Sequence, residues 1–277
     1  MQYVKISVSM PNSSETERDT LTYYLSEAGC DSFETNDTAS MLYAYISKTL
    51  LNHESLKETL SGYTYTVEDM EDKDWNEEWE KSGFTPIVID NRCVICGSNH
   101  TDLPDVEYRI TVNPKMAFGS GHHQTTASML CWLLRDNFKG KRVLDMGCGT
   151  AVLGILASMR GASEVDGIDI DEWSVRNARE NCALSGVSMN ISLGDAALLA
   201  SQGKTYNAIF ANINLNILLR DMETYCAALE PKGVLYMSGF YTSDLPQLSR
   251  RAKRLGLEYL GSIENEDWVA AKFCKLS

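Results

Sequence analysis

From about Phe84 onward, short apolar runs alternate with stretches in which apolar residues recur every three or four positions. Runs of four to eight apolar residues favour buried strands, and the longer periodic stretches favour helices. The pattern predicts strands at 141–145, 164–169, 189–193, 206–211 and 233–238, helices at 151–160 and 172–185, one that ends near 229 and one at 244–254, and a final hairpin at 257–263 and 268–273. This alternation is typical of a parallel, doubly wound sheet with its sites at the carboxyl ends of the strands.

The first 67 residues follow a different order. Strand-like runs and periodic stretches alternate as β-α-β-β-α-β, which is the order of a ferredoxin-like fold. The expected strands are 3–8, 31–35, 41–46 and 63–67, and the expected helices are 13–28 and 50–60. The predicted fold class is therefore α/β, a doubly wound sheet preceded by a small α+β domain.

An acidic segment separates the two patterns. Residues 68–80 read EDMEDKDWNEEWE, with eight acids and one lysine. Trp75 and Trp79 are four residues apart and share one face of a helix, where they dock on a neighbouring domain or contact a basic partner. We expect a small domain at 1–67, an acidic linker helix at 68–83 and a larger domain at 84–277.

Charge is unevenly spread along the 277 residues. Residues 1–80 hold 5 Lys or Arg and 17 Asp or Glu, whereas residues 81–277 hold 20 and 21. Strong acidity argues against general binding to a nucleic-acid backbone, which needs basic surface. It suits a basic partner, or it serves only to keep the protein soluble. We expect no direct nucleic-acid partner.

The lack of a recognisable targeting signal and the scattered cysteines predict a cytoplasmic protein. No apolar run approaches the roughly 18 residues that span a bilayer, and Met1 is not followed by the basic and apolar regions of a secretory signal. The eight cysteines are scattered, as reduced, buried thiols are. Cys93 and Cys96 have metal-like CxxC spacing, but the segment also fits a strand, so structural thiols are favoured and no metal is expected. The acidic segment offers no self-complementary apolar patch, so we expect a monomer.

The strongest motif is VLDMGCGT at residues 143–150. A strand ends in Asp145, and Gly147 and Gly149 then make a tight turn into a helix, because glycine lets the backbone approach a ligand closely. Val152 stands where a dinucleotide fingerprint has its third glycine, so that fingerprint fails. A carboxylate before the turn would repel a pyrophosphate and suits a cationic, phosphate-free ligand such as S-adenosylmethionine.

Further acids follow the next two strands. Asp169 ends the second strand, 22 residues after Gly147, where a carboxylate accepts hydrogen bonds from ribose hydroxyls. Asp171 fits a helix cap better than a second ribose contact. Asp195 follows the third strand, where it either accepts from the adenine amino group or caps a helix.

This order of motifs resembles the class I S-adenosylmethionine-dependent methyltransferases, whose sheet is Rossmann-like. Upstream, residues 114–126 read PKMAFGSGHHQTT, which is similar to the Pro-Gly-x-Ala-Phe-Gly-Thr-Gly-x-His-x-Thr-Thr stretch of the ribosomal protein L11 methyltransferases (PrmA type). The acidic Asp74-Trp75-x-x-x-Trp79 segment and Ala211-Asn212-Ile213 after the fourth strand match that family too. The resemblance covers nearly the whole chain.

The resemblance implies roles for individual residues. Thr126 matches a cofactor contact at a helix start, where amides can hold the methionine carboxylate. Gly147 matches the glycine that lies against the cofactor, Asp169 the ribose acid, and Asn212 the residue that faces the methionine end and the active site. Phe118 stacks on the cofactor or packs in the core.

The resemblance also implies the reaction, which is methyl transfer to lysine and/or N-terminal amino groups of ribosomal protein L11, a basic protein. The side-chain oxygen of Asn212 and the backbone carbonyl of Ile213 would accept hydrogen bonds from the amine. His122 and His123 either relay a proton or order their loop. Lys115 and Ser120 stand where the family has Gly and Thr, which bears on substrate specificity. A methyltransferase that acts on a small molecule or RNA is the alternative.

Overall fold

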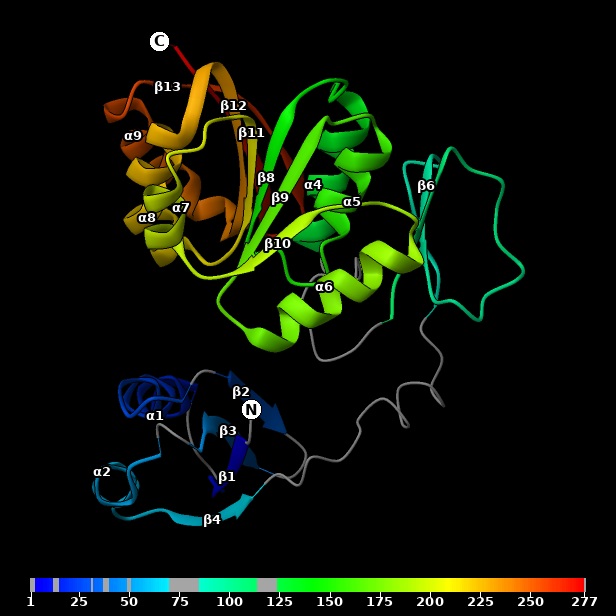
Figure 1. Ribbon diagram of the computed structural model, residues 1–277. Coiled ribbons are helices and arrows are strands. Elements are labelled where there is room, and N and C mark those ends of the chain that lie inside the picture. Colours follow the sequence, from blue (N-terminus) through cyan, green and yellow to red (C-terminus); the bar gives the residue numbers. More distant parts are fainter. Residues whose placement is uncertain are drawn as a thin grey trace. The chain divides into compact units, whose positions relative to one another are not determined.

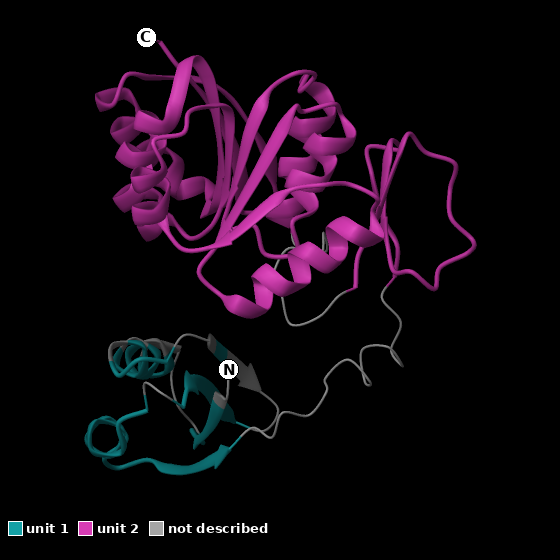
Figure 2. Ribbon diagram, in the orientation of Figure 1, with its two compact units in different colours: residues 1–74 teal, residues 75–277 magenta. Residues whose placement is uncertain are grey.

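The computed structural model describes residues 3–11, 15–30, 32–36, 40–48, 51–69, 85–113 and 124–276. The chain divides into two compact units, Met1–Asp74 and Trp75–Ser277 (Figure 2). In the described part of the chain, no helix is long and apolar enough to cross a membrane.

The smaller unit is an antiparallel sheet with two helices. Its strands lie in the order β2-β3-β1-β4, which is the ferredoxin-like arrangement that the element order predicts. In β1 every second residue is buried, namely Val4, Ile6 and Val8, because successive side chains of a strand point to opposite faces. The elements are β1 (Tyr3–Ser9), α1 (Glu15–Glu27), β2 (Ser32–Asn36), β3 (Met41–Ser47), α2 (His53–Thr59) and β4 (Thr64–Asp69).

A three-stranded sheet, β5 (Ile87–Ile89), β6 (Cys93–Cys96) and β7 (Tyr108–Thr111), begins the described part of the larger unit. The strand expected at Cys93 and Cys96 is confirmed, and both thiols are buried. Burial raises the pKa of Cys93 to about 12, so its thiol stays protonated. The flanking strands were not expected, because three or four residues are too few for a periodic signal.

The main sheet of the larger unit has the order β10-β9-β8-β11-β12-β14-β13 (Figure 1). The first five of these strands are parallel, and β14 runs antiparallel to both β12 and β13. The strands are β8 (Arg142–Met146), β9 (Glu164–Asp169), β10 (Asn190–Leu193), β11 (Tyr206–Asn212), β12 (Leu229–Tyr241), β13 (Leu257–Asn265) and β14 (Trp268–Lys275). The predicted doubly wound sheet with a terminal hairpin is confirmed.

Helices cover both faces of this sheet (Figure 1). One face packs on α4 (Gln124–Arg135), α5 (Val152–Met159) and α6 (Glu172–Leu184), and the other on α7 (Ala196–Gln202), α8 (Leu215–Ala228) and α9 (Leu245–Arg254). Val143 and Leu144 show the alternation, since Val143 belongs to the first core and Leu144 to the second. The short helix α7 is not among the helices whose bounds the pattern predicts, although a helix capped by Asp195 was one of the two roles considered for that residue. It has only seven residues, and its start is set by the cap Asp195.

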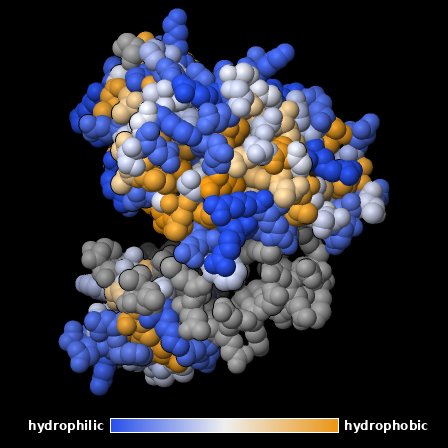
Figure 3. All heavy atoms as spheres, viewed as in Figure 1, coloured by the Kyte–Doolittle hydropathy of each residue, from blue (hydrophilic) through white to orange (hydrophobic). Residues whose placement is uncertain are grey.

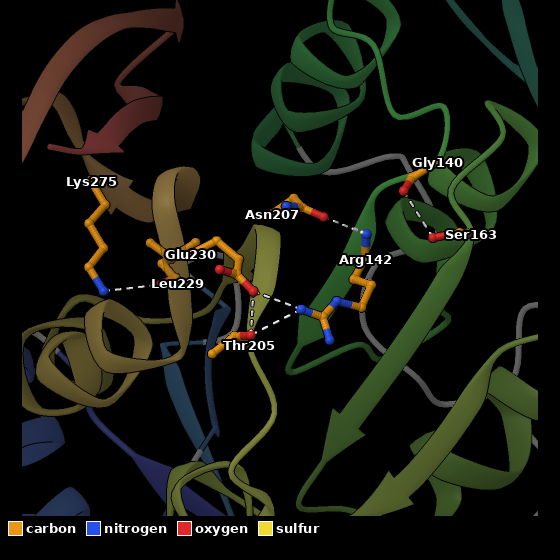
Figure 4. A network of polar contacts seen from close by, with 8 residues as sticks. All are labelled: Gly140, Arg142, Ser163, Thr205, Asn207, Leu229, Glu230 and Lys275. Atoms are coloured by element: carbon orange, nitrogen blue, oxygen red, sulfur yellow. Dashed lines mark hydrogen bonds and ion pairs between the residues drawn. The ribbon is translucent and has the colours of Figure 1, made fainter. Parts of the chain in front are cut away.

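Polar contacts close the amino-terminal edge of the main sheet (Figure 4). Arg142, at the start of β8, pairs with Glu230 at 2.7 Å and donates to the Thr205 hydroxyl at 3.0 Å. Lys275, at the end of the antiparallel β14, donates to the Leu229 carbonyl at 2.8 Å. The opposite, carboxyl-terminal edge carries the predicted site residues.

Candidate active site

The turn after β8 is built on positive-φ backbone. Gly147 has φ +67° and Gly149 has φ +51°, and Ala151, directly before α5, also lies in the left-handed region at +64°. A Cβ added to Gly147 would lie 2.5 Å from Cγ2 of Ile213. Glycine is required at 147 because neither the backbone angle nor the space admits a side chain.

Asp169 holds this turn in place from the end of the neighbouring strand β9. Its Oδ2 accepts a hydrogen bond from the Gly149 amide at 2.8 Å, and its Oδ1 accepts from the Asp171 amide at 3.0 Å. Burial raises the pKa of Asp169, against the opposing effect of these amides. Asp171 itself caps α6 by accepting from the Ser174 amide at 2.9 Å, as its spacing predicts.

Asp145 is almost fully buried beneath the turn. Among the described residues, its Oδ2 accepts a hydrogen bond from the Gly154 amide in α5 at 2.9 Å. Burial raises the pKa of Asp145 to about 7, and the negative charge of Asp169 contributes in the same direction. The carboxylate is therefore incompletely neutralised by the protein, so a positive charge placed near it is stabilised.

Asn212 ends β11 and faces the first turn of α4. Its Nδ2 donates to Oγ1 of Thr126 at 3.2 Å, whereas its Oδ1 is buried without a partner among the described residues. A buried acceptor without a donor is costly, so this oxygen is suited to a donor brought by a ligand. Ile213 follows, and its amide donates to the Ser238 carbonyl of β12 at 3.1 Å.

Four of the predicted residues, Thr126, Asp145, Gly147 and Asn212, line one small recess at the carboxyl edge of the sheet. Sequence analysis missed three of its lining residues, Cys148, Val152 and Leu153, and also Gly154, the donor to Asp145, because an apolar or small residue in or after the glycine motif carries no chemical signal of its own. The lining residues are Thr126, Asp145, Gly147, Cys148, Val152, Leu153 and Asn212.

The other predicted site residues lie around this recess or outside the described residues. Gly149 and Asp169 are joined by their hydrogen bond, and Ile213 contacts the Gly147 position. Asp195 follows β10 and caps α7, where it accepts from the Ala197 amide at 2.9 Å. Phe118 lies outside the described residues, together with His122, His123 and residues 70–80 of the acidic segment, whereas its first two residues, 68 and 69, end β4 and are not helical as predicted.

The rim of this edge beyond Asp169 is partly apolar. Ile170 is 72% exposed, and Leu193 at the end of the adjacent strand β10 is 48% exposed. Figure 3 shows apolar side chains among charged ones on this face of the larger unit. An apolar surface beside a carboxylate fits a ligand that combines a ring with hydroxyl groups.

Comparison with known proteins assigns the chain to a family. A family model described as ribosomal protein L11 methyltransferase (PrmA) matches residues 5–275. Curated proteins named ribosomal protein L11 methyltransferase from Phocaeicola vulgatus and Bacteroides fragilis are 44% and 46% identical, over 99% of both chains. The chain belongs to the ribosomal protein L11 methyltransferase family. A crystal structure of a ribosomal protein L11 methylase from Lactobacillus delbrueckii subsp. bulgaricus aligns with a TM-score of 0.63 and 26% identity, covering 70% of this chain and 100% of that one.

Membership of the PrmA family confirms the predicted fold class, enzyme class and cofactor. The protein is a class I methyltransferase that depends on S-adenosylmethionine. The recess fits this cofactor on grounds of its own. Gly147 contributes only backbone to the lining of the recess, Asp145 favours a cation such as a sulfonium, and Asn212 offers an acceptor that has no partner among the described residues.

Proposed function

We propose that this enzyme transfers methyl groups from S-adenosylmethionine to lysine and/or N-terminal amino groups of ribosomal protein L11. The observation that carries the proposal is the unpartnered, buried Oδ1 of Asn212 in the recess. An amine substrate supplies the N–H donor that this oxygen lacks. Support for the identity of the protein substrate comes from the names of the relatives in Phocaeicola vulgatus and Bacteroides fragilis.

The cofactor supplies a methyl group bonded to a positively charged sulfur. We assign its ribose to Asp169, its adenine amino group to Asp195, and its methionine carboxylate to Thr126 and the start of α4. Gly147 and Gly149 let the backbone lie against it, and Phe118 covers it. The charge of Asp145 favours a cationic ligand over a neutral one.

The chain's own part in the reaction is to position an uncharged amine. A lysine ammonium has no lone pair, and removal from water lowers its pKa. Asn212 Oδ1 and the Ile213 carbonyl then accept N–H bonds and aim the lone pair at the methyl carbon. Methyl transfer to that lone pair would form the N–C bond as the cofactor's C–S bond breaks, would leave the bonding electrons on sulfur, and would release the proton of the new ammonium to solvent. Alignment of the three reacting atoms is the main source of rate.

We further propose that the N-terminal domain, residues 1–67, recognises the protein substrate. Residues 1–80 carry a net charge of −12, which complements a basic ribosomal protein. The acidic linker, residues 68–83, joins this domain to the methyltransferase domain, residues 84–277. Movement about the linker would present several amines in turn.

The test is methyl transfer by an Asn212→Ala variant. With ribosomal protein L11 from the same organism as substrate, we expect kcat to fall about 100-fold, as when one positioned hydrogen-bonding group is lost from an active site. Calorimetry should show cofactor affinity within a few-fold of wild type. Intact-mass spectrometry counts the methyl groups, and peptide mapping locates them.

Asn207→Ala is the matched control. Asn207 lies on the same strand β11, but its Oδ1 accepts from the Arg142 amide at the opposite edge of the sheet, at 2.9 Å. We expect wild-type kcat from it. If wild-type enzyme binds the cofactor but adds no methyl group to L11, the proposed substrate is wrong, and RNA and small amines become the next substrates to test.

A further inference from the structure

An aromatic pair lies on the carboxyl edge of the main sheet, beside the recess. Tyr241 ends β12 and Trp268 begins β14, and the two are register partners. Their ring centroids are 4.3 Å apart with planes inclined by 34°, and Tyr241 is 50% exposed. The Tyr241 ring, half-exposed and stacked on the partly buried Trp268, offers a large, rigid contact surface. We call these two residues the aromatic platform.

The backbone connects this platform to the candidate active site. Ser238 of β12 is the register partner of Asn212, and Tyr241 follows three residues later, beyond an irregularity in the strand between Met237 and Phe240. Between them, Gly239 (φ +93°) lies directly against the backbone of Ile213. The platform therefore continues one wall of the recess outward.

A second connection runs through α4. Glu266, in the turn between β13 and β14, accepts a hydrogen bond from Nε2 of Gln124 at 2.8 Å. Gln124 is the first residue of α4, and Thr126, two residues on, bonds Asn212. The Thr242 amide also donates to the Asp267 carbonyl at 2.8 Å. The turn next to Trp268 is thus held against both neighbouring elements.

Charge around the platform has a single sign. The stretches 239–246 and 261–271 contain four acids and no lysine or arginine. Glu264, Glu266 and Asp267 are exposed, and the fourth acid, Asp244, accepts from the Tyr241 amide at 3.1 Å. Exposed carboxylates around an aromatic surface suit a ligand that is cationic and has an apolar stem.

We propose that the aromatic platform binds the aliphatic stem of the target lysine and that the surrounding carboxylates hold neighbouring basic residues of the protein substrate. The inference rests on the proposed function and adds a specificity element to it. A lysine carries four methylene groups between its backbone and its amine, so with the amine at Asn212 the backbone end of its stem extends toward the platform. An N-terminal amine has no such stem, so Tyr241 and Trp268 favour lysine side chains over the N-terminus.

The test compares methylation of lysines and of the N-terminus in the same ribosomal protein L11. For Tyr241→Ala we expect KM for the lysine sites to rise about tenfold, with kcat and cofactor affinity within twofold of wild type. The N-terminal site should change by less than twofold. Tyr241→Phe keeps the ring and should restore wild-type KM, which a role of the hydroxyl would not allow. Site-resolved initial rates come from peptide mapping.

Tyr259→Ala is the matched control. Tyr259 lies on β13 of the same hairpin, is 45% exposed and packs on Phe273 with centroids 5.4 Å apart, but it is near the opposite end of the strand pair. We expect wild-type KM from it. The proposed role of the platform is wrong if the lysine KM of Tyr241→Ala is unchanged, or if KM rises equally at the lysine and N-terminal sites. The reaction itself is tested independently by Asn212→Ala. If the wild-type enzyme methylates no lysine of L11, the proposed binding of a lysine stem by the platform is wrong as well.

Discussion

Two buried aspartates, Asp145 and Asp166, lie one register step apart in the main sheet, on neighbouring strands and opposite faces. Leu144 of β8 pairs with Asp166 of β9, and Asp145 pairs with Gly167. Among the described residues, Asp145 accepts a hydrogen bond from one backbone amide, that of Gly154. Asp166 accepts hydrogen bonds from three side chains, the Tyr206 hydroxyl at 2.7 Å, the Lys204 ammonium at 2.8 Å and the Asn190 amide at 2.9 Å. Both side chains are buried, but in the described part of the chain Asp166 has three donors and Asp145 has one.

The pKa values of the two carboxyl groups shift in opposite directions. Burial alone would raise both pKa values. At Asp166 the hydrogen bonds from Lys204, Tyr206 and Asn190 outweigh burial, so the pKa lies below its usual value. At Asp145 burial prevails, and the pKa rises to about 7. A structural carboxylate is fully satisfied by the fold, whereas one beside a ligand site is left for the ligand to satisfy.

The largest expected effect comes from removing the satisfied carboxylate. Asp166→Ala leaves the buried Tyr206 hydroxyl and the Asn190 amide without their acceptor. Each orphaned group costs about 1–3 kcal/mol, so we expect the free energy of unfolding to fall by about 3–4 kcal/mol in urea titrations. The exposed Asp105→Ala should change it by less than about 0.5 kcal/mol. A loss below about 1 kcal/mol at Asp166 would contradict the comparison.

A smaller effect, on cofactor binding, is expected at the turn above Asp145. Gly147 and Gly186 have nearly equal φ angles, +67° and +68°, but a Cβ at 186 meets nothing within 4 Å. Alanine costs similar backbone strain at both. By calorimetry, Gly147→Ala should weaken S-adenosylmethionine binding at least tenfold, because its Cβ displaces Ile213, whereas Gly186→Ala should leave it unchanged. Equal affinities would show that the turn adapts to a side chain.

The smallest effect is the pH dependence that Asp145 introduces. Its folded-state pKa of about 7 lies above the usual aspartate value, so its contribution to stability is complete at low pH and is lost as the pH rises through about 7. The free energy of unfolding of the wild type should therefore fall between pH 5 and pH 8. In Asp145→Asn that fall should be smaller by on the order of 1 kcal/mol.

Asp166 provides the contrast for this measurement. Because its pKa is lowered, its contribution is lost only as the pH falls through that lowered value, well below pH 5. Urea titrations of wild type and Asp145→Asn at pH 5 and at pH 8 measure this dependence. Parallel pH profiles for the two proteins would show that Asp145 stays ionised in the folded state throughout this range.

Much of the fold could be predicted from local signals. The strand Glu164–Asp169 has the bounds that its apolar run predicts, and the terminal hairpin lies where the pattern placed it. The glycine turn after Asp145 and the cap at Asp171 also follow from neighbouring residues. Such features depend on backbone preference and on periodicity, which a short stretch of sequence contains completely.

The sequence by itself thus determined the alternating strands and helices of the main sheet and, through its motifs, the family and cofactor. Only the tertiary structure decided which of the candidate residues meet. Asn212 bonds Thr126 across 86 positions, and Gln124 bonds Glu266 across 142. It also decided that Asp145 lacks the donors that Asp166 has, and that Tyr241 lies against Trp268. Pairings of this kind arise when strands and helices pack, because burial and distance depend on the whole fold and no local preference encodes them.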